Sequence, residues 1–429
     1  MLDRAQDGEV LFGGRPLASI LEEARVSTPA YVYDLASMAA EARDVVDAFQ
    51  GHPHLVAFAV KANSAGAVVR TLADAGCGAE VGSLAELEVA KSCGIDAHGL
   101  LLSGMGKSVA AIDAAIALGD RGIFAIQVDS IDELARIAGR ARALGRAARI
   151  ALRVNPAVRA DTHAAIATGH EEAKFGIMRA DLASAYGAIA REGAALRLVG
   201  LGGHVGSQLV RTDEYFEAAE ELLGLAREWE AQGPPLELID FGGGFGIDYG
   251  DGCPVRPRDF VTGIVARTRD AGLGGRAIVV EPGRSLVGAH GLLVASVVAT
   301  KVAVERRWAV LDAGMSDLLR PALYGARHRI EPLRSAPCRD DATAASLRSR
   351  SWRVVGPVCE SSDEFGEYLL PDPLPERVVL RDAGAYGFTM ASNYNGRGLP
   401  AEVFVHASGE LSVSRAGAAP AWIESRLAT

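Results

Sequence analysis

The sequence lacks the features that mark disulfide-rich, zinc-binding and membrane-spanning proteins. Its five cysteines form no CxxC pair and are odd in number, which argues against a disulfide framework or a zinc knuckle. The longest apolar stretch runs from about Leu286 to Val298, is interrupted by His290 and falls short of the ~20 residues that a membrane helix needs. We therefore expect neither a metal site nor a membrane span.

Runs of basic residues are also missing. The chain has 44 Lys and Arg against 54 Asp and Glu, a formal net charge of −10, and no basic run that would attract nucleic acid or an anionic membrane. Residues 1–9 lack the order of a basic segment followed by an apolar one that a secretory signal has. These absences favour a cytoplasmic protein that acts on a small molecule.

The 429 residues, 49% of them hydrophobic, are enough for two domains with a large core. From Thr28 to about Glu281, apolar runs alternate with Ala-rich amphipathic segments, which is typical of repeated βα units and favours a closed (β/α)₈ barrel over an open doubly wound sheet. The predicted strands are Ala30–Tyr33, Leu55–Lys61, Ala79–Gly82, Leu100–Ser103, Ile123–Val128, Ile150–Asn155, Leu198–His204, Leu236–Gly242 and Ala277–Glu281. Helices are predicted at Ile131–Leu144, Asp181–Arg191 and Asp213–Gln232.

After Glu281 the helical periodicity fades and a second, mostly β domain, a sandwich or a barrel, is predicted. Its strands are expected at Gly291–Val304, Trp308–Leu311, Trp352–Val355, Arg377–Leu380 and Glu402–His406, with Gly8–Phe12 as a further candidate. The polar segment 334–350 is expected to be a surface loop. The sequence thus divides into a barrel at residues 28–285 and a β domain made of residues 1–27 plus 286–429.

Lys61 ends the uninterrupted apolar run Leu55–Val60, whose pattern suits a parallel strand that is covered on both faces. A lysine at the end of such a strand is not expected to be buried unless something pairs with it, and desolvation would lower the pKa of its amine so that it can form a Schiff base. The alternative is a solvated lysine that closes a strand. The remainder of the chain decides between them.

Active-site groups of a barrel lie at the carboxyl ends of its strands. Besides Lys61, three reactive side chains are predicted there on separate strands, namely Arg153, His204 and Glu281. Each has an ordinary alternative: a core histidine for His204, and a solvated carboxylate before a turn for Glu281. Their coincidence on separate strands favours a shared site.

The glycines Gly242–Gly244 and Gly246 follow an apolar strand. Successive glycines let backbone N–H groups converge on an anion, so a phosphate cradle is one interpretation; a tight turn between strand and helix is the other. The dinucleotide pattern GxGxxG is not met, because Ile247 stands where its third glycine would fall. Ser207 and Arg284 would support the phosphate interpretation if they converge on this turn.

A Schiff-base lysine, a phosphate cradle, a histidine and a carboxylate together match the needs of pyridoxal 5'-phosphate. In that interpretation Lys61 holds the aldehyde, the glycine turn holds the phosphate, and Glu281 keeps the ring nitrogen protonated so that the ring accepts electrons. His204 would lie against the ring.

The chain resembles the fold-type III pyridoxal-phosphate-dependent decarboxylases, and among them most closely the diaminopimelate decarboxylase family. The motifs that carry the resemblance cover nearly the whole chain in family order and are weak singly. They are Ala59–Asn63, Thr162–Ile177, Gly203–Gln208, Gly242–Gly246, Glu281–Arg284, Asp312–Tyr324, Gly356–Asp363, Asp382–Gly387 and Tyr394–Arg397.

The resemblance implies decarboxylation of meso-2,6-diaminopimelate to L-lysine and carbon dioxide, the last step of lysine biosynthesis, by a homodimer with shared active sites. It makes Lys61 the Schiff-base lysine, His204 the residue stacked on the ring and Glu281 the partner of the pyridine nitrogen. Further coenzyme contacts are implied for Ser207, Gly243, Gly244, Gly283, Arg284 and Tyr386. Substrate contacts are implied for Arg284, Arg320, Tyr324, Glu360 and Tyr386. Cys359 and Glu360 would come from the partner subunit, with Cys359 as the general acid.

Without the family pattern, Cys359 would be interpreted as a small packed residue, Arg320 as a surface charge and Tyr386 as a packed aromatic. The chain also departs from the family at Glu80–Glu86, where the family has Asp-Val-Val-Ser and a glycine-rich turn. Further departures are Ser362, where glycine is frequent, and Gly398, where proline is usual.

Other functions remain open from the sequence. The nearest is decarboxylation of another diamino acid, such as D-ornithine, D-lysine or a substrate of a specialised pathway. Racemisation on the same barrel fits less well, because the context of Cys359 and Glu360 resembles the decarboxylases. A non-catalytic binding protein would be expected to lose Lys61 or Cys359, and this chain has both.

Overall fold

The computed structural model describes residues 2–155, 175–304, 306–335, 348–415 and 419–427. Most of the matching stretch Thr162–Ile177 and most of the predicted loop 334–350 lie outside these residues. The chain divides into two compact units, each formed from segments far apart in sequence. The β unit comprises Met1–Met38, Asp248–Gly252 and Val287–Thr429, and the barrel unit comprises Ala39–Ile247 and Cys253–Leu286.

Parallel strands of the barrel unit close into a (β/α)₈ barrel, because β8 pairs with β10 as well as with β7. The eight strands that the described residues contribute to the ring are β4 (His54–Ala59), β5 (Gly78–Val81), β6 (Leu100–Leu102), β7 (Ala125–Val128), β8 (Ala148–Asn155), β10 (Leu196–Gly203), β11 (Leu238–Gly243) and β12 (Ala277–Glu281). A short strand, β9 (Ile177–Met178), pairs with the end of β8. Side chains from these strands, among them Ala57, Leu101 and Val279, are buried together in one core cluster.

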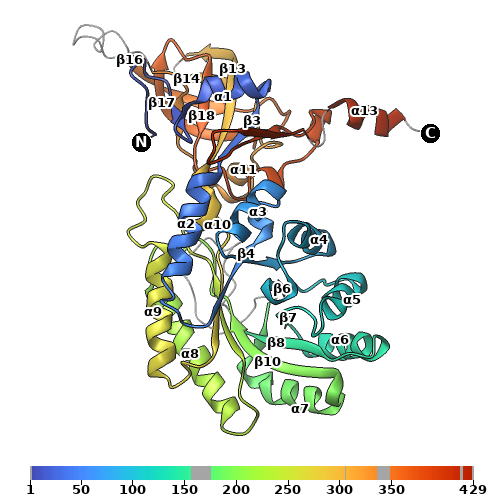
Figure 1. The fold of residues 1–429 in the computed structure, drawn as a ribbon. Coiled ribbons are helices and arrows are strands. Elements are labelled where there is room, and N and C mark those ends of the chain that lie inside the picture. The colour runs from blue at the N-terminus through green and yellow to red at the C-terminus, as the bar shows by residue number, and fades with distance from the viewer. Residues whose placement is uncertain (1, 156–174, 305, 336–347, 416–418, 428–429) are drawn as a thin grey trace. The chain divides into compact units, whose positions relative to one another are not determined.

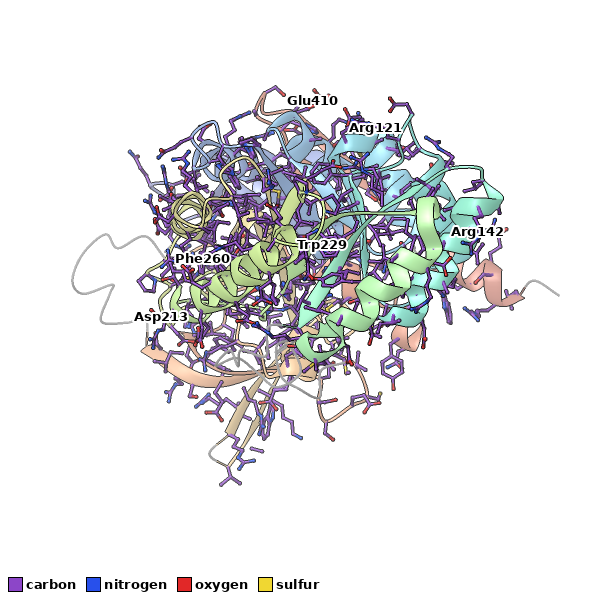
Figure 2. All side chains as sticks on the ribbon, turned by 90° about the horizontal axis from the view of Figure 1, so that it is seen from below. Arg121, Arg142, Asp213, Trp229, Phe260 and Glu410 are labelled. Atoms are coloured by element: carbon purple, nitrogen blue, oxygen red, sulfur yellow. The ribbon has the colours of Figure 1, made fainter. Side chains whose placement is uncertain are left out.

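Helices lie around the outside of the strands (Figure 1). They are α3 (Gly66–Asp74), α4 (Leu84–Ser92), α5 (Val109–Ala117), α6 (Ile131–Ala143), α7 (Leu182–Glu192), α8 (Asp213–Glu230) and α9 (Pro257–Asp270). Figure 2 shows α8 running from Asp213 toward Trp229, with Phe260 of the neighbouring α9 beside it. The rings of Tyr215 and Phe260 meet edge to face at 5.2 Å and help to pack the two helices together.

The sequence explains these elements locally. The barrel strands are nearly continuous in apolar residues because core side chains cover one face and helices cover the other. Helix α6 shows the usual helical arrangement: it buries Leu134, Ile137 and Ala141 on one face, and it carries acidic residues in its first turn and arginines in its last. The predicted barrel is therefore confirmed.

The β unit contains a mixed sheet in the order β17-β16-β14-β13-β3-β19-β20, and β18 pairs with both β13 and β15. Its strands are β3 (Ala30–Asp34), β13 (Gly291–Ala303), β14 (Arg306–Leu311), β15 (Ile330–Pro332), β16 (Arg348–Val355), β17 (Glu364–Asp372), β18 (Arg377–Leu380), β19 (Ala401–Val405) and β20 (Leu411–Ser414). Further elements of the chain are β1 (Leu11–Phe12), β2 (Arg15–Pro16), α1 (Leu17–Ala24), α2 (Leu35–Asp47), α10 (Arg284–Val287), α11 (Arg320–Tyr324) and α13 (Ala419–Leu427).

Two predictions about these segments need correction. The run Ala30–Tyr33 was assigned to the barrel but pairs with β13 and β19, so this part of the predicted 28–285 domain lies in the β unit. The predicted loop 334–350 ends early, because β16 already begins at Arg348. The candidate strand Gly8–Phe12 is confirmed in part, since β1 lies in the β unit and pairs with β2 as a small hairpin. No helix in the described ranges is long and apolar enough to span a membrane.

Candidate active site

Lys61 lies just beyond strand β4, in the 3₁₀ turn Val60–Ala62. The strand ends two residues earlier than predicted because the chain turns there, with the N–H of Asn63 donating to the carbonyl of Val60. The Lys61 Nζ is 2.7 Å from Oε2 of Glu80, a buried carboxylate whose other oxygen accepts from the hydroxyl of Ser103. The lysine side chain is half exposed, so this pairing, rather than burial, fixes the amine at the mouth of the barrel.

Two further carboxylates lie on adjacent strands, Asp240 within β11 and Glu281 at the end of β12, and an amide bridges them. The Gln127 Nε2 donates to Asp240 and, over 2.7 Å, to Glu281. Burial raises the pKa of Asp240 to about 6, although hydrogen bonds from Gly242 and Gln127 oppose the rise. Burial, with repulsion from Asp240 and Glu80, raises the pKa of Glu281 well above its ordinary value. Both shifts favour a proton held by the pair.

His204 follows strand β10 and is held as a neutral imidazole. Burial, together with the positive charges of Arg153 and Lys61, lowers its pKa to about 3. Its Nδ1 accepts from the N–H of Gly243 at 3.2 Å, so the ring proton sits on Nε2. A neutral imidazole in this position presents a flat face without adding a cation.

The glycine turn after β11 is tight in its own right. Gly242 and Gly244 have φ of +65° and +93°, and a Cβ on Gly244 would lie 2.1 Å from the carbonyl oxygen of Gly206. Gly243 has no room for a side chain either, since a Cβ there would lie 2.0 Å from the carbonyl oxygen of Glu281. The tight turn by itself therefore requires glycine at these positions. A role in phosphate binding has to be supported by the residues around the turn.

Arg284 and Ser207, which were expected to converge, do so. The Arg284 Nη2 donates to the Ser207 hydroxyl over 2.9 Å. Arg284 begins the short helix α10 directly after Gly283, and its side chain is buried. A buried guanidinium beside a hydroxyl is a donor set that suits a phosphate or a carboxylate.

A buried ion cluster supports Arg153 at the same end of the barrel, and sequence reasoning missed it. The Arg153 guanidinium lies 3.5 Å from Asp129, which in turn lies 3.6 Å from the fully buried Lys107. Lys107 also pairs with Glu133 at 3.1 Å. Asp129 immediately follows strand β7, so its strand-end position was the signal that could have found it. Lys107 lies five residues beyond the end of β6, and its sequence position gave no such signal.

The β unit carries the other predicted residues. Arg320 and Tyr324 belong to helix α11, and Arg320 is buried against His328 and the ring of Tyr249. Tyr386 lies in the loop Asp382–Gly387 and has a φ of +54°. That loop is tied down by the N–H groups of Ala383 and Gly384, which donate to backbone carbonyls near the start of β13.

Cys359 and Glu360 occupy the exposed loop between β16 and β17. Buried Asp363 fixes this loop, since its carboxylate accepts from the N–H groups of Met315 and Val358, each at 2.6 Å. The Tyr394 hydroxyl donates to Glu360 at 2.6 Å. The loop is thus held at its base while the cysteine remains accessible.

The departures from the family pattern have local explanations. Ser83 accepts from the N–H of Glu86 and begins α4, while the Glu86 carboxylate accepts from the N–H of Gly82 at 2.7 Å, so the loop closes as a helix cap. Gly398 has a φ of +79°, which proline cannot adopt. The Ser362 hydroxyl donates to the sulfur of Met315 over 3.8 Å, a contact that glycine could not make.

Comparisons with known proteins agree with this site. The family described as pyridoxal-dependent decarboxylase, pyridoxal binding domain, matches residues 35–288. The diaminopimelate decarboxylase of Pseudomonas aeruginosa is 40% identical over 93% of this chain and 92% of its own length. The chain belongs to the diaminopimelate decarboxylases of the pyridoxal-dependent decarboxylase family.

Solved structures of the family share the fold. Diaminopimelate decarboxylase from Helicobacter pylori, complexed with L-lysine, has a TM-score of 0.83 at 33% identity and is matched over 94% of this chain and 98% of its own. The M. jannaschii enzyme in co-complex with L-lysine has a TM-score of 0.88 at 30% identity, over 100% of this chain and 98% of its own. The coenzyme of this decarboxylase is accordingly pyridoxal phosphate.

The barrel residues fit that coenzyme on their own chemistry. Lys61 supplies the amine, and Arg284 with Ser207 supplies donors for an anion. The raised pKa values of Asp240 and Glu281 favour a proton on this pair, which a pyridine nitrogen can share. All of these residues belong to the barrel unit.

Proposed function

We propose that Lys61, His204 and Glu281 form the coenzyme site of a decarboxylase that converts meso-2,6-diaminopimelate to L-lysine and carbon dioxide. The observation that carries the proposal is the electrostatic cluster of the amine, the neutral imidazole and the carboxyl of raised pKa at the strand ends of one barrel. Bound pyridoxal phosphate supplies an electron sink that stabilises the carbanion left when carbon dioxide departs.

The barrel residues hold and orient that coenzyme. Lys61 would hold the aldehyde carbon, Glu281 would share a proton with the ring nitrogen, and His204 would lie against the ring. Arg284, Ser207 and the N–H groups of the glycine turn would bind the phosphate; the family resemblance gives Tyr386 as a further phosphate contact. The neutrality of His204 matters here. The protonated ring nitrogen beside Glu281 is already positive, and a second cation against the ring would oppose that protonation.

Substrate carboxylates are bound by arginines. Arg320 and Tyr324 lie on the short helix α11, and a buried guanidinium binds a carboxylate through paired, charge-assisted hydrogen bonds. Arg284 supplies a second cation. Glu360, oriented by Tyr394, has the charge that a distant amino group requires.

Cys359 is the proton donor to the carbon from which carbon dioxide has left. Its exposed position suits a site completed by a second copy of the chain. Apolar side chains are also exposed on the sheet that carries the loop, with Val298 and Val302 each 58% exposed and Leu369 76% exposed. Such surface favours a homodimer that covers it.

The substrate is tested by incubating the purified holoenzyme with the meso and LL isomers of diaminopimelate while carbon dioxide and lysine are measured. Equal amounts of both products from the meso isomer, and none from the LL isomer, are expected. Turnover of D-ornithine or D-lysine in preference to the meso isomer would reassign the substrate.

The shared site is tested by mixing two inactive variants, Lys61→Ala and Cys359→Ala. If the two residues come from different subunits, random exchange gives heterodimers with one intact site, and about a quarter of wild-type activity returns. No recovery after proven subunit exchange would place both residues in one chain.

A further inference from the structure

Two of the groups that contact Arg320 are an imidazole and a phenol ring. The Arg320 Nη1 lies 2.8 Å from Nε2 of His328, and its guanidinium carbon lies 4.8 Å from the centre of the Tyr249 ring. The imidazole and the phenol ring meet edge to face at 5.3 Å. Arg320 is 6% exposed and His328 is 1% exposed, so these contacts are made away from water.

The hydrogen bonds of His328 define its protonation. Its Nδ1 lies 2.8 Å from the backbone carbonyl of Arg381, which can only accept, so Nδ1 carries the proton and donates. Nε2 must then use its lone pair to accept from Arg320. The backbone of His328 is itself held, because the Tyr368 hydroxyl donates to its carbonyl at 2.7 Å.

We propose that His328 is a positioning residue, which aims the Arg320 guanidinium at a substrate carboxylate while leaving its positive charge intact. The proposal rests on the function proposed above. A carboxylate in the place of this imidazole would also fix the guanidinium, but it would neutralise the charge that attracts the substrate. The neutral imidazole and the aromatic face orient the guanidinium and add no negative charge beside it.

The carboxylate in question is the one that the substrate retains. A cation on the departing carboxylate would stabilise the charged ground state more than a transition state from which that charge is leaving, and would slow the reaction. A cation on the retained carboxylate binds ground and transition states alike. Loss of correct aim at Arg320 should therefore raise KM more than it lowers kcat.

The test uses an isosteric pair of variants in the holoenzyme, His328→Gln and His328→Glu, which differ only in charge. The probes are L-lysine, which carries one carboxylate, and 1,5-diaminopentane, which carries none. Their binding is measured by titration calorimetry, with KM and kcat for meso-diaminopimelate alongside. We expect H328E to weaken L-lysine roughly 10- to 100-fold, the worth of a charge-assisted hydrogen bond, with little change for 1,5-diaminopentane. H328Q keeps an acceptor for Arg320 and should lose only a few-fold.

Equal L-lysine affinities for the two variants, or equal losses for both probes, would overturn the proposal. Melting temperature and coenzyme absorbance show whether the buried glutamate is tolerated; if it is not, His328→Leu replaces it, and the same selective loss of L-lysine against H328Q is required. A wild-type protein that binds L-lysine with this selectivity but releases no carbon dioxide would refute the proposed reaction and leave the role of His328 standing.

Discussion

Replacing Glu402 by glutamine should change how the stability of the protein depends on pH. Glu402 lies on β19, is 4% exposed, and accepts a hydrogen bond of 3.0 Å from the Tyr33 hydroxyl. Burial raises its pKa from 4.5 to about 7, against the opposing effect of that hydrogen bond. Because the folded state binds the proton more tightly than the unfolded state, Glu402 favours folding at low pH, and this contribution is lost as the pH rises through about 7.

The size of the effect follows from the pKa. A rise of about 2.5 pH units corresponds to roughly 3 kcal/mol at ~1.4 kcal/mol per unit. Glutamine keeps the acceptor for Tyr33 and cannot ionise. Between pH 4.5 and 8, the wild type should therefore lose roughly 3 kcal/mol relative to Glu402→Gln, or roughly 6–12 °C in melting temperature for a domain of this size.

The assay is calorimetric melting of both proteins at several pH values in this range. Effects from other titrating groups cancel in the difference between the two proteins. Tyr33→Phe is the matched second variant: it keeps the ring that stacks on Phe404 but removes the donor, so the loss should extend to higher pH. Parallel melting curves for wild type and Glu402→Gln across the whole range would refute the reasoning.

Three further predictions concern the site. Lys61→Ala should abolish both the coenzyme's visible absorbance and turnover, measured by spectrophotometry and lysine release; retention of either would remove the role given to this amine. Cys359→Ala should keep that absorbance and lower kcat by roughly 10²- to 10⁴-fold, the usual worth of a general acid, and unchanged kinetics would assign the proton to another group. Gly243→Ala should weaken coenzyme binding in equilibrium dialysis and destabilise the fold by roughly 1–3 kcal/mol, because its Cβ would lie 2.0 Å from the Glu281 carbonyl oxygen. Gly139→Ala, in helix α6 with open space around it, is the control and should stabilise by up to about 1 kcal/mol; equal effects of the two substitutions would contradict the argument.

Much of the barrel could be predicted from sequence because its strands are covered on both faces. Such strands appear as short, continuous apolar runs between amphipathic helices, and the helix predicted at Ile131–Leu144 differs by only one residue from α6. The same pattern misplaced Ala30–Tyr33. That strand is also buried, and its sheet is decided by pairing with β13 and β19, which lie far away in the sequence. The local amino-acid sequence does not show which distant strands a segment will pair with.

In the β unit, strand β17 (Glu364–Asp372) was missed for a different reason. Its buried and exposed residues alternate irregularly, and Gly366 interrupts the pattern with a φ of +113°. Strand β20 has no buried residue, so it offers no apolar signal at all. Such strands are stabilised by backbone hydrogen bonds to a neighbouring strand, and these bonds leave no periodic pattern of apolar residues in the sequence.

The reactive residues of the site were easier to find than the residues that support them. Lys61, His204 and Glu281 could be found because they end apolar strands. Glu80 and Gln127 also lie on such strands. An acidic or amide side chain inside a buried apolar run, however, has no evident role until its partner is known. Their roles emerge only when the closed barrel brings strands β4, β5, β7 and β12 around one centre.

The supporting residues also explain how the barrel tolerates so much buried acid. Glu80, Asp240 and Glu281 are each largely withdrawn from water, and three ionised carboxylates there would cost far more than the fold could spare. Glu80 is neutralised by Lys61, while the raised pKa values of Asp240 and Glu281 favour a proton shared between them. That proton relieves the repulsion within the pair. Under the proposed function the same proton would be shared with the ring nitrogen of the coenzyme, so that one arrangement of carboxylates on neighbouring strands would serve both the stability of the barrel and the activation of the coenzyme.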